Sequence, residues 1–301
     1  MASVGSQGRL QGKVAIVTGA SRGLGRAVAS AFARDGAAIA VVARTEAEWH
    51  PQLPGTIHDV VSEIKDAGGR AVAIAADLSK SDDVERIVPA TRDALGPIDI
   101  LINNAALTVP GRPPPPGSSA PTQPAPPQEA PDRTRATTKM SSSFLDFPLK
   151  GYRLHLEVGT FASYRLMQLA LPDMIASGGG SIVNISSLAG FMPGEGPYER
   201  PGSPGPIAYG GNKAALHHLT QVVAVEMQAH GIAANVLSPS EPVITPGNLV
   251  AAAGETNWAI PEDFAEATLR VALADPKMVN GQLLWSDDVL HPELGPRGWL
   301  R

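Results

Sequence analysis

The sequence predicts one α/β domain whose core is a doubly wound parallel sheet. Three observations predict it: short apolar runs alternate with helix-like segments, the first run leads into a glycine-rich turn, and a chain of 301 residues suits one large domain. Unbroken apolar runs of strand length are typical of strands buried on both faces. Strands that alternate with helices require right-handed crossovers, and these make the sheet parallel.

The predicted elements follow one another as strand and helix in regular order. The first strand, residues 13–17, leads through the glycine-rich turn into an alanine-rich helix at 26–34, which Gly36 closes. The later elements, in chain order, are a strand at 38–43, a helix at 60–67, a strand at 71–75, a helix at 82–94, a strand at 98–102, a helix at 154–176, a strand at 181–185, a helix at 209–229 and a strand at 232–237. No unit of about 20–50 residues recurs, so we expect a single domain over residues 1–301 and no repeat fold.

Composition excludes several other classes of protein. A net charge of -5 argues against nucleic acid as the main partner, and the absence of cysteine excludes disulfides and thiolate metal sites. The histidines show no ligand spacing, so no metal is predicted. The N-terminal residues lack an apolar signal core, and the longest apolar run, residues 37–43, is too short to span a bilayer. We therefore expect a cytoplasmic protein without a membrane or nucleic-acid partner.

Two segments interrupt the alternation and are predicted as surface insertions, at about 107–143 and 190–207. Residues 110–131 contain ten of the 28 prolines, mixed with Gly, Ser, Gln and Thr. This composition cannot bury apolar surface and favours a flexible or polyproline loop. A ligand for a proline-recognition module is the less favoured alternative.

The glycine-rich turn has the residues that a phosphate-binding turn needs. Gly19, Gly23 and Gly25 follow the first strand and open the first helix, with the spacing Gly-x3-Gly-x-Gly. Glycines there permit a tight turn and let backbone N–H groups approach a pyrophosphate at the helix N-terminus. We therefore predict a Rossmann-type fold that binds a dinucleotide, with Ser21, Arg22 and Leu24 of the same turn among the contacts.

The end of the second strand favours NADP(H) over NAD(H). Arg44 stands where an acidic residue would bond the adenosine ribose hydroxyls of NAD, and Arg22 supplies a second cation. Two guanidinium groups suit a 2′-phosphate, which arginine binds through paired charge-assisted hydrogen bonds. The alternative is that both arginines are solvated surface residues.

Three side chains form a candidate acid–base cluster. Of the four tyrosines only Tyr209 has a lysine four residues on, Lys213, and that spacing places both on one helix face. A nearby ammonium, together with the positive nicotinamide ring, is expected to lower the pKa of the phenol, which could then protonate a carbonyl or deprotonate an alcohol. Ser187, just after the strand at 181–185, could hydrogen-bond the same oxygen at the carboxyl edge of the sheet.

The motifs taken together resemble the short-chain dehydrogenase/reductase family. They occur in the family's order: the glycine turn, Asp77-Leu78, Asn103-Asn104-Ala105-Ala106, Asn184-Ile185-Ser186-Ser187 and Tyr209-x3-Lys213. The resemblance covers nearly the whole chain outside the two insertions. It implies a homodimer or homotetramer that interconverts an alcohol with a ketone or aldehyde, using NADP(H).

The resemblance also implies roles for single residues. Tyr209 would be the acid/base, Lys213 would hold the nicotinamide ribose, and Ser187 would orient the substrate, with Ser186 its less favoured neighbour. The remaining implied cofactor residues are Asp77 and Leu78 beside the adenine, Asn103 between the central strands, Ala105 after the fourth strand, and Val243 and Thr245 near the carboxamide and pyrophosphate. Residues 53–57 and the ending 280–282 are similar to the hydroxysteroid-dehydrogenase-like branch.

Three departures from the family pattern bear on the activity. Gly159 falls where the family carries a helical Asn that orders a proton-relay water, so the relay side chain is expected to be missing and its space open to water or substrate. The gap between Ser187 and Tyr209 is about nine residues longer than usual, and Pro239-Ser240 replaces Pro-Gly. The alternative to a working enzyme is therefore a catalytically weakened NADP-binding protein.

Overall fold

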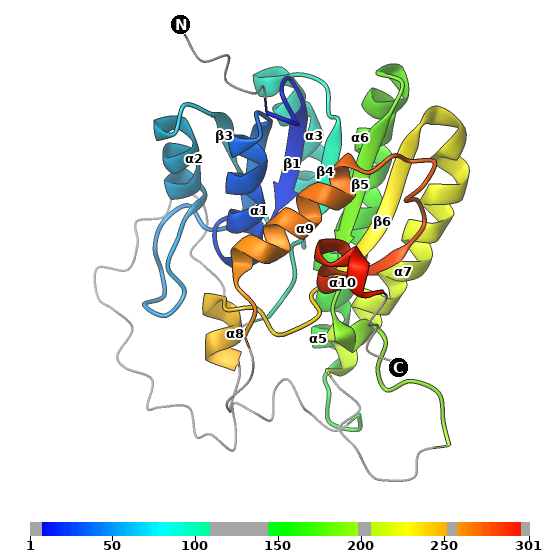
Figure 1. Ribbon diagram of the computed structural model, residues 1–301. Helices are drawn as coiled ribbons and strands as arrows, with labels where there is room; N and C mark the ends of the chain where they lie inside the picture. Colours follow the sequence, from blue (N-terminus) through cyan, green and yellow to red (C-terminus); the bar gives the residue numbers. More distant parts are fainter. Residues whose placement is uncertain (1–7, 109–143, 198–205, 252–257, 296–301) are drawn as a thin grey trace, which may run out of the picture.

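A seven-stranded parallel sheet forms the centre of the computed structural model, which describes residues 8–108, 144–197, 206–251 and 258–295 (Figure 1). The strands are β1 (Val14–Thr18), β2 (Ala38–Ala43), β3 (Arg70–Ala75), β4 (Ile100–Asn103), β5 (Gly180–Ile185), β6 (Ile232–Ser238) and β7 (Leu283–Trp285). Their order in the sheet is β3-β2-β1-β4-β5-β6-β7, and every pair is parallel. The doubly wound parallel sheet predicted from the sequence is confirmed.

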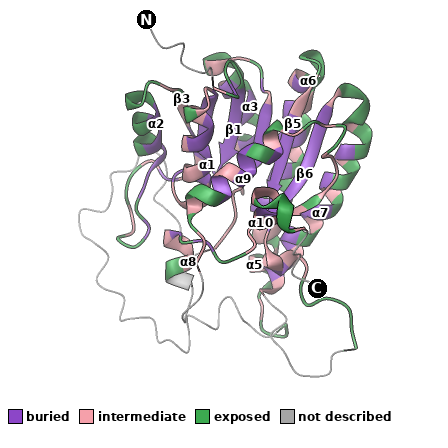
Figure 2. Cartoon of the chain, in the orientation of Figure 1, coloured by how far each residue is buried: buried purple, intermediate pink, exposed green. Residues whose placement is uncertain are grey.

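Helices cover both faces of this sheet and bury it. The helices are α1 (Gly23–Arg34), α2 (Ile57–Asp66), α3 (Ser81–Leu95), α5 (Leu149–His155), α6 (Ala162–Ala176), α7 (Ile207–Met227), α8 (Pro246–Ala251), α9 (Pro261–Leu273) and α10 (Ser286–Leu290). One apolar core lies under α1, α2 and α9, and a second lies under α3, α6 and α7. In β1 the buried side chains alternate between the two cores, with Val17 in the first and Ile16 in the second. Figure 2 shows the strands buried between helices whose outer faces are exposed.

The order of the strands places a ligand site at the carboxyl ends of β1 and β4. Strand β1 pairs with β2 on one side and with β4 on the other. The strands before β4 are therefore added on one side of β1 and the later strands on the opposite side, so the order of the sheet reverses at β1. Ligands of open α/β sheets bind in the crevice at such a switch point. The loops that follow β1, β4 and β5 meet there, and they carry the glycine turn, Asn104 and Ser187.

The structure differs from the sequence prediction in two places. The predicted helix at 154–176 begins earlier, at Leu149, and contains a π-helical turn at Leu156–Phe161. Elements after residue 237 were not predicted: β7 has three residues and α8 and α10 are too short for a periodic apolar pattern, whereas the 13-residue α9 is long enough and was missed. Residues 110–131, and residues 198–205 of the second insertion, lie outside the described residues. Among the described residues, no helix is long and apolar enough to cross a membrane.

Candidate active site

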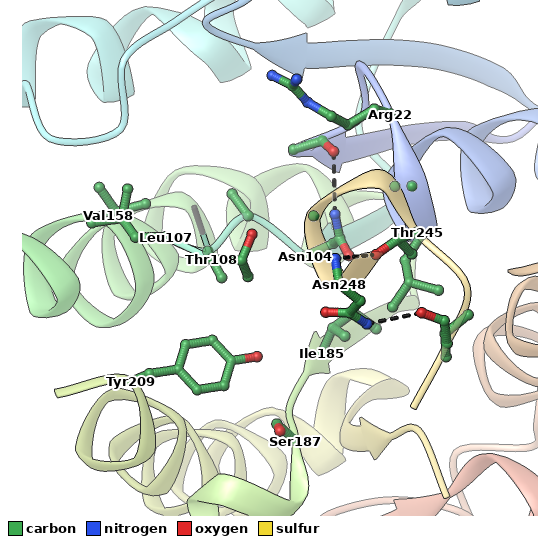
Figure 3. A pocket seen from close by; sticks show the side chains of 18 of the residues that line it. Arg22, Asn104, Leu107, Thr108, Val158, Ile185, Ser187, Tyr209, Thr245 and Asn248 are labelled. Carbon is green, nitrogen blue, oxygen red and sulfur yellow. Dashed lines mark hydrogen bonds between the residues drawn. The ribbon is translucent and has the colours of Figure 1, made fainter. Parts of the chain in front are cut away.

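Ser187, Tyr209 and Lys213 come together at the carboxyl edge of the sheet. Ser187 precedes the short 3-10 helix Leu188–Gly190 that follows β5, and Tyr209 and Lys213 lie one turn apart on α7. The Ser187 hydroxyl lies near that of Tyr209, and both side chains enter one cavity (Figure 3). The additional residues between Ser187 and Tyr209 therefore leave their contact intact.

Burial controls the proton affinities of the two titratable members of this cluster. Lys213 is 1% exposed, and its Nζ donates a 2.5 Å hydrogen bond to the Ile185 carbonyl. Burial lowers the pKa of Lys213 to about 8. Burial also raises the pKa of Tyr209, and the Ser187 hydrogen bond opposes that shift. In the chain without cofactor Nζ lies 5.6 Å from the phenol ring centre and bonds Ile185, so a lowering of the Tyr209 pKa by Lys213 together with a bound nicotinamide stays a prediction.

The glycine turn at the N-terminus of α1 leaves no room for side chains at Gly19 and Gly25. A Cβ on Gly25 would lie 2.3 Å from the Gly19 carbonyl oxygen, and Gly19 itself has a positive φ of 67°. Asn104 fixes the turn from β4, because its Nδ2 donates to the Thr18 carbonyl at 2.8 Å. No side chain caps the first turn of α1, so its N–H groups remain available to an anion. This narrow cradle fits a pyrophosphate.

Arg22 and Arg44 both line the cavity beyond the glycine turn. Arg22 is anchored there, since its guanidinium donates to the Leu53 carbonyl at 2.6 Å and to Thr45 Oγ1 at 3.0 Å. Burial, and then the charge of Arg44, holds the pKa of Arg22 below its ordinary value. The mutual repulsion of two neighbouring cations shows that this end of the cavity is electropositive and suits an anionic group.

Most residues predicted to bind a cofactor line one cavity of about 570 Å³. They are Gly19, Ser21, Arg22, Gly23, Leu24, Gly25, Arg44, Asp77, Leu78, Ala105, Val243 and Thr245, together with Ser187, Tyr209 and Lys213. Asn103 does not line it: its Nδ2 donates to Asn184 Oδ1 at 2.8 Å and ties β4 to β5, while the next residue, Asn104, faces the cavity. The role of steadying the central strands therefore matches the position of Asn103.

The space expected to be open at Gly159 is occupied. Gly159 lies in the π-helical turn, and a Cβ placed on it would be 2.2 Å from both Oδ1 and Nδ2 of Asn212. The prediction of room for water or substrate at this position is therefore wrong. The carboxamide that occupies this space belongs to Asn212 of α7, and not to a residue of the π-helical turn that contains position 159.

Sequence reasoning missed several polar residues around the cluster. Ser186 Oγ lies 2.6 Å from His217 Nε2 in a buried pair, and the His155 ring stands edge-on to Tyr209 with 6.4 Å between ring centres. Trp49 lines the cavity near Arg44, and its buried Nε1 has no partner among the described residues. No local pattern marks these side chains, because segments distant in the sequence bring them to the site.

The chain belongs to the short-chain dehydrogenase family. The family model described as short chain dehydrogenase matches residues 13–121 and 134–248, and these ranges include the glycine turn and the catalytic cluster. The chain is therefore an oxidoreductase of this family, whose members bind a nicotinamide dinucleotide.

Curated relatives include one hydroxysteroid dehydrogenase of similar length. The 7alpha-hydroxysteroid dehydrogenase of Escherichia coli K12 is 28% identical over 286 residues, which cover 92% of this chain and 93% of that protein. A short chain dehydrogenase of Pseudocercospora fijiensis is 34% identical over 233 residues, or 77% of this chain and 60% of its own length. Hydroxysteroid dehydrogenase-like protein 2 of Xenopus laevis is 50% identical over 99 residues, 33% of this chain and 24% of that protein. The chain thus spans less than two thirds of the latter two relatives.

Solved structures of the family share the fold over nearly the whole chain. A short chain dehydrogenase from Mycobacterium thermoresistibile superposes with a TM-score of 0.72 at 29% identity, covering 95% of this chain and 89% of that one. A 7 alpha-hydroxysteroid dehydrogenase in complex with NADH and 7-oxo glycochenodeoxycholic acid gives 0.69 at 26% identity, covering 92% and 93%. A chain from Beutenbergia cavernae with NADP bound at low occupancy gives 0.66 at 27% identity, covering 93% and 98%.

Proposed function

We propose that this protein is an NADP(H)-dependent oxidoreductase that interconverts a ketone or aldehyde with the corresponding alcohol. The observation that carries the proposal is that Ser187, Tyr209 and the buried Lys213 meet in the cavity that also contains the glycine turn. A phenol, a hydroxyl and an ammonium in this arrangement can handle one proton at a carbonyl oxygen.

The two arginines support NADP(H) as the cofactor. Arg22 and Arg44 line the cavity at the end of β2, the residue directly after this strand is Arg44 and not an acid, and Trp49 adds a buried N–H donor there. Relatives have been solved with either cofactor, NADH in one and NADP in another. The preference for NADP(H) therefore rests on the charges of this chain.

The residues of the cluster divide the proton chemistry among them. A bound nicotinamide supplies or accepts the hydride. The Tyr209 hydroxyl donates its proton to the carbonyl oxygen during reduction and accepts it back during oxidation, while the Ser187 hydroxyl holds that oxygen in place. The Lys213 ammonium stabilises the phenolate left on Tyr209, because a nearby positive charge favours the anionic form. The glycine cradle and Thr245 would hold the pyrophosphate of a bound cofactor.

The substrate is proposed to be an apolar carbonyl compound of moderate size. The part of the cavity beside Tyr209 is lined by Leu107, Val158, Leu188 and Trp258, and Figure 3 shows Leu107 and Val158 across from the phenol. Thr108 adds a polar side chain beside Leu107, and burial of apolar surface on the other residues would hold the substrate. The cyclic keto compound bound to the solved hydroxysteroid dehydrogenase is of this chemical type.

We also propose that the protein forms a homodimer or homotetramer. Large apolar side chains are exposed on the helices beside the active site, among them Phe161 at 52%, Tyr164 at 46% and Val225 at 76%. Exposed apolar side chains that gather on helices mark association surfaces in soluble proteins. Light scattering after size-exclusion chromatography measures the state; a monomer at micromolar concentration would contradict the proposal.

The experiment that tests the function follows the absorbance of reduced nicotinamide with a panel of aldehydes, aliphatic ketones and ring ketones. We expect oxidation of NADPH with at least one apolar ketone, and a much weaker reaction when NADH replaces NADPH. The matched control is Tyr209→Phe, which keeps the ring and removes the proton donor. Binding of NADPH without turnover of any carbonyl would favour the alternative, a binding protein without chemistry.

A further inference from the structure

The side chain of Asn212 fills the space that any side chain at position 159 would need. A Cβ on Gly159 would lie 2.2 Å from Asn212 Oδ1, 2.2 Å from Nδ2 and 2.5 Å from Cγ. Contacts this short between a Cβ and the middle of a buried amide do not occur in folded proteins, and neither Gly159 nor Asn212 is at the surface. The two residues are therefore complementary, one large and one without a side chain.

The Asn212 amide is held in one orientation by the facing helix. Thr160 Oγ1, from the π-helical turn, donates a 2.7 Å hydrogen bond to Asn212 Oδ1. Asn212 is 1% exposed and Thr160 is 6% exposed, so loss of this bond would leave a buried polar group without its partner. A π-helical turn inside an α-helix is itself frequent at functional sites.

The next residue along α7 is Lys213, whose position depends on how α7 packs. Its ammonium is 1% exposed and reaches the Ile185 carbonyl at the end of β5, so the helix must approach β5 at a defined distance and rotation. Asn212, in the same turn of α7, packs against Gly159 of the π-helical turn. Lys213 and Asn212 thus fix this turn of α7 against two different elements.

We propose that Asn212 is a positioning residue for Lys213, and that position 159 is glycine because the Asn212 amide occupies its side-chain space. This inference rests on the proposed function, since it assigns Lys213 a part in the proton chemistry of Tyr209. On this inference, the glycine at position 159 is a packing requirement and is no sign that catalytic activity has been lost. The carboxamide next to the catalytic lysine is supplied by α7.

Two histidines lie close enough to Lys213 to feel its charge, so their protonation must be considered in any pH profile of the enzyme. His217 faces it from α7 and His155 faces it from α5, and the pKa of each is lowered by burial and then by the Lys213 charge. Both are therefore neutral above about pH 7, close to the ordinary histidine pKa. Above that pH, Tyr209 and Lys213 are the groups of this cluster that titrate.

The first test replaces the amide with Asn212→Ala in the full chain. We expect kcat to fall by about tenfold to a hundredfold, because a catalytic group displaced by about 1 Å loses that much. The KM for NADPH should change far less, and the pH of half-maximal alcohol oxidation should rise, because a displaced ammonium favours the phenolate less. Thr91→Ala, which truncates a buried residue with a 2.8 Å hydrogen bond on α3, is the control and should keep the wild-type profile.

The second test exchanges the two residues and measures melting temperature without cofactor. Gly159→Asn alone should be strongly destabilised, whereas Gly159→Asn with Asn212→Gly should melt well above it, since one amide again fills one space. Asn212→Gly alone completes the cycle, so the helix penalty of the introduced glycine occurs in that single variant and in the double variant and cancels in the coupling between the two positions. Additive losses would overturn the complementarity.

The two tests separate failure of this inference from failure of the proposed function. If the wild-type chain reduces a ketone and Asn212→Ala keeps its kcat and pH profile, the positioning role is wrong and the function stands. If the wild-type chain reduces no carbonyl, the proposed function fails, and with it the catalytic half of the inference. The melting temperatures still decide whether Gly159 and Asn212 are complementary.

Discussion

Ser186 Oγ and His217 Nε2 lie 2.6 Å apart in a buried hydrogen bond beside the catalytic cluster. Ser186 directly precedes Ser187, and His217 is one helical turn beyond Lys213. The ring of His217 stacks on Phe191, whose ring in turn packs on Trp285 of β7 at 5.1 Å. This chain of contacts ties the segment that carries Ser187 to α7 on one side and to the edge of the sheet on the other.

This pair makes folding stability depend on acidity. Burial, and then the charge of Lys213, lowers the pKa of His217 to about 4 in the folded protein, below the ordinary 6.5. Between these values the unfolded chain binds the proton and the folded chain does not, so stability is full above pH 6.5 and falls as pH drops toward 4. The His217 contribution amounts to about 3 kcal/mol over that window. Urea unfolding at a series of pH values measures it, and His217→Gln should lose that part of the slope. An unchanged slope would mean that His217 does not titrate.

Cofactor preference is predicted to depend on Arg44. Arg44→Asp should weaken NADPH binding by roughly 1.5–3 kcal/mol, the range for hydrogen bonds to charged groups, while NADH binding should hold or improve. Fluorescence titration of both cofactors measures the change. Arg70→Asp, at the exposed start of β3, makes the same change of net charge away from the cavity and should leave both affinities as they are. Equal affinity of the wild-type chain for NADPH and NADH would refute the assignment.

The glycine cradle is predicted to tolerate no side chain at position 25. In Gly25→Ala the new Cβ would meet the Gly19 carbonyl at 2.3 Å, so the turn must open and cofactor affinity should fall at least about tenfold, or 1.4 kcal/mol. Gly151→Ala on α5 is the matched control, because its Cβ would meet only the side chains of Phe147 and Pro148, at 3.4 Å or more. Calorimetric binding of NADPH to both variants checks this; unchanged affinity in Gly25→Ala would mean that the cofactor lies elsewhere.

The proline-rich segment is predicted to be dispensable for stability. Residues 110–131 lack the apolar content to form a core, and loop-closure entropy changes slowly with loop length, so their deletion should shift the melting temperature little. Differential scanning fluorimetry compares the shortened and full chains. A drop of more than about 8 °C would show that the segment packs on the domain or on a second subunit.

The sequence was sufficient to predict the parts of the fold and site that depend on local patterns. Strands β1 to β6 are continuous apolar runs, and the glycine turn and the Tyr209–Lys213 spacing lie within single elements. The contact of Asn212 with Gly159 could not be predicted, since it joins residues 53 positions apart on two helices. Strand β7 was missed for a related reason: three residues show no pattern, and pairing with β6 creates the strand.

The most direct test of the central claim is to measure NADPH binding and ketone reduction together for the wild-type chain and for Tyr209→Phe. The phenol is the proton donor next to the buried Lys213, whereas the cradle at Gly19 and Gly25 does not use it. We predict that turnover falls by about 10²–10⁴-fold while the affinity for NADPH changes by less than about threefold. Turnover within a few-fold of the wild-type rate would contradict the account, because another group would then be supplying the proton.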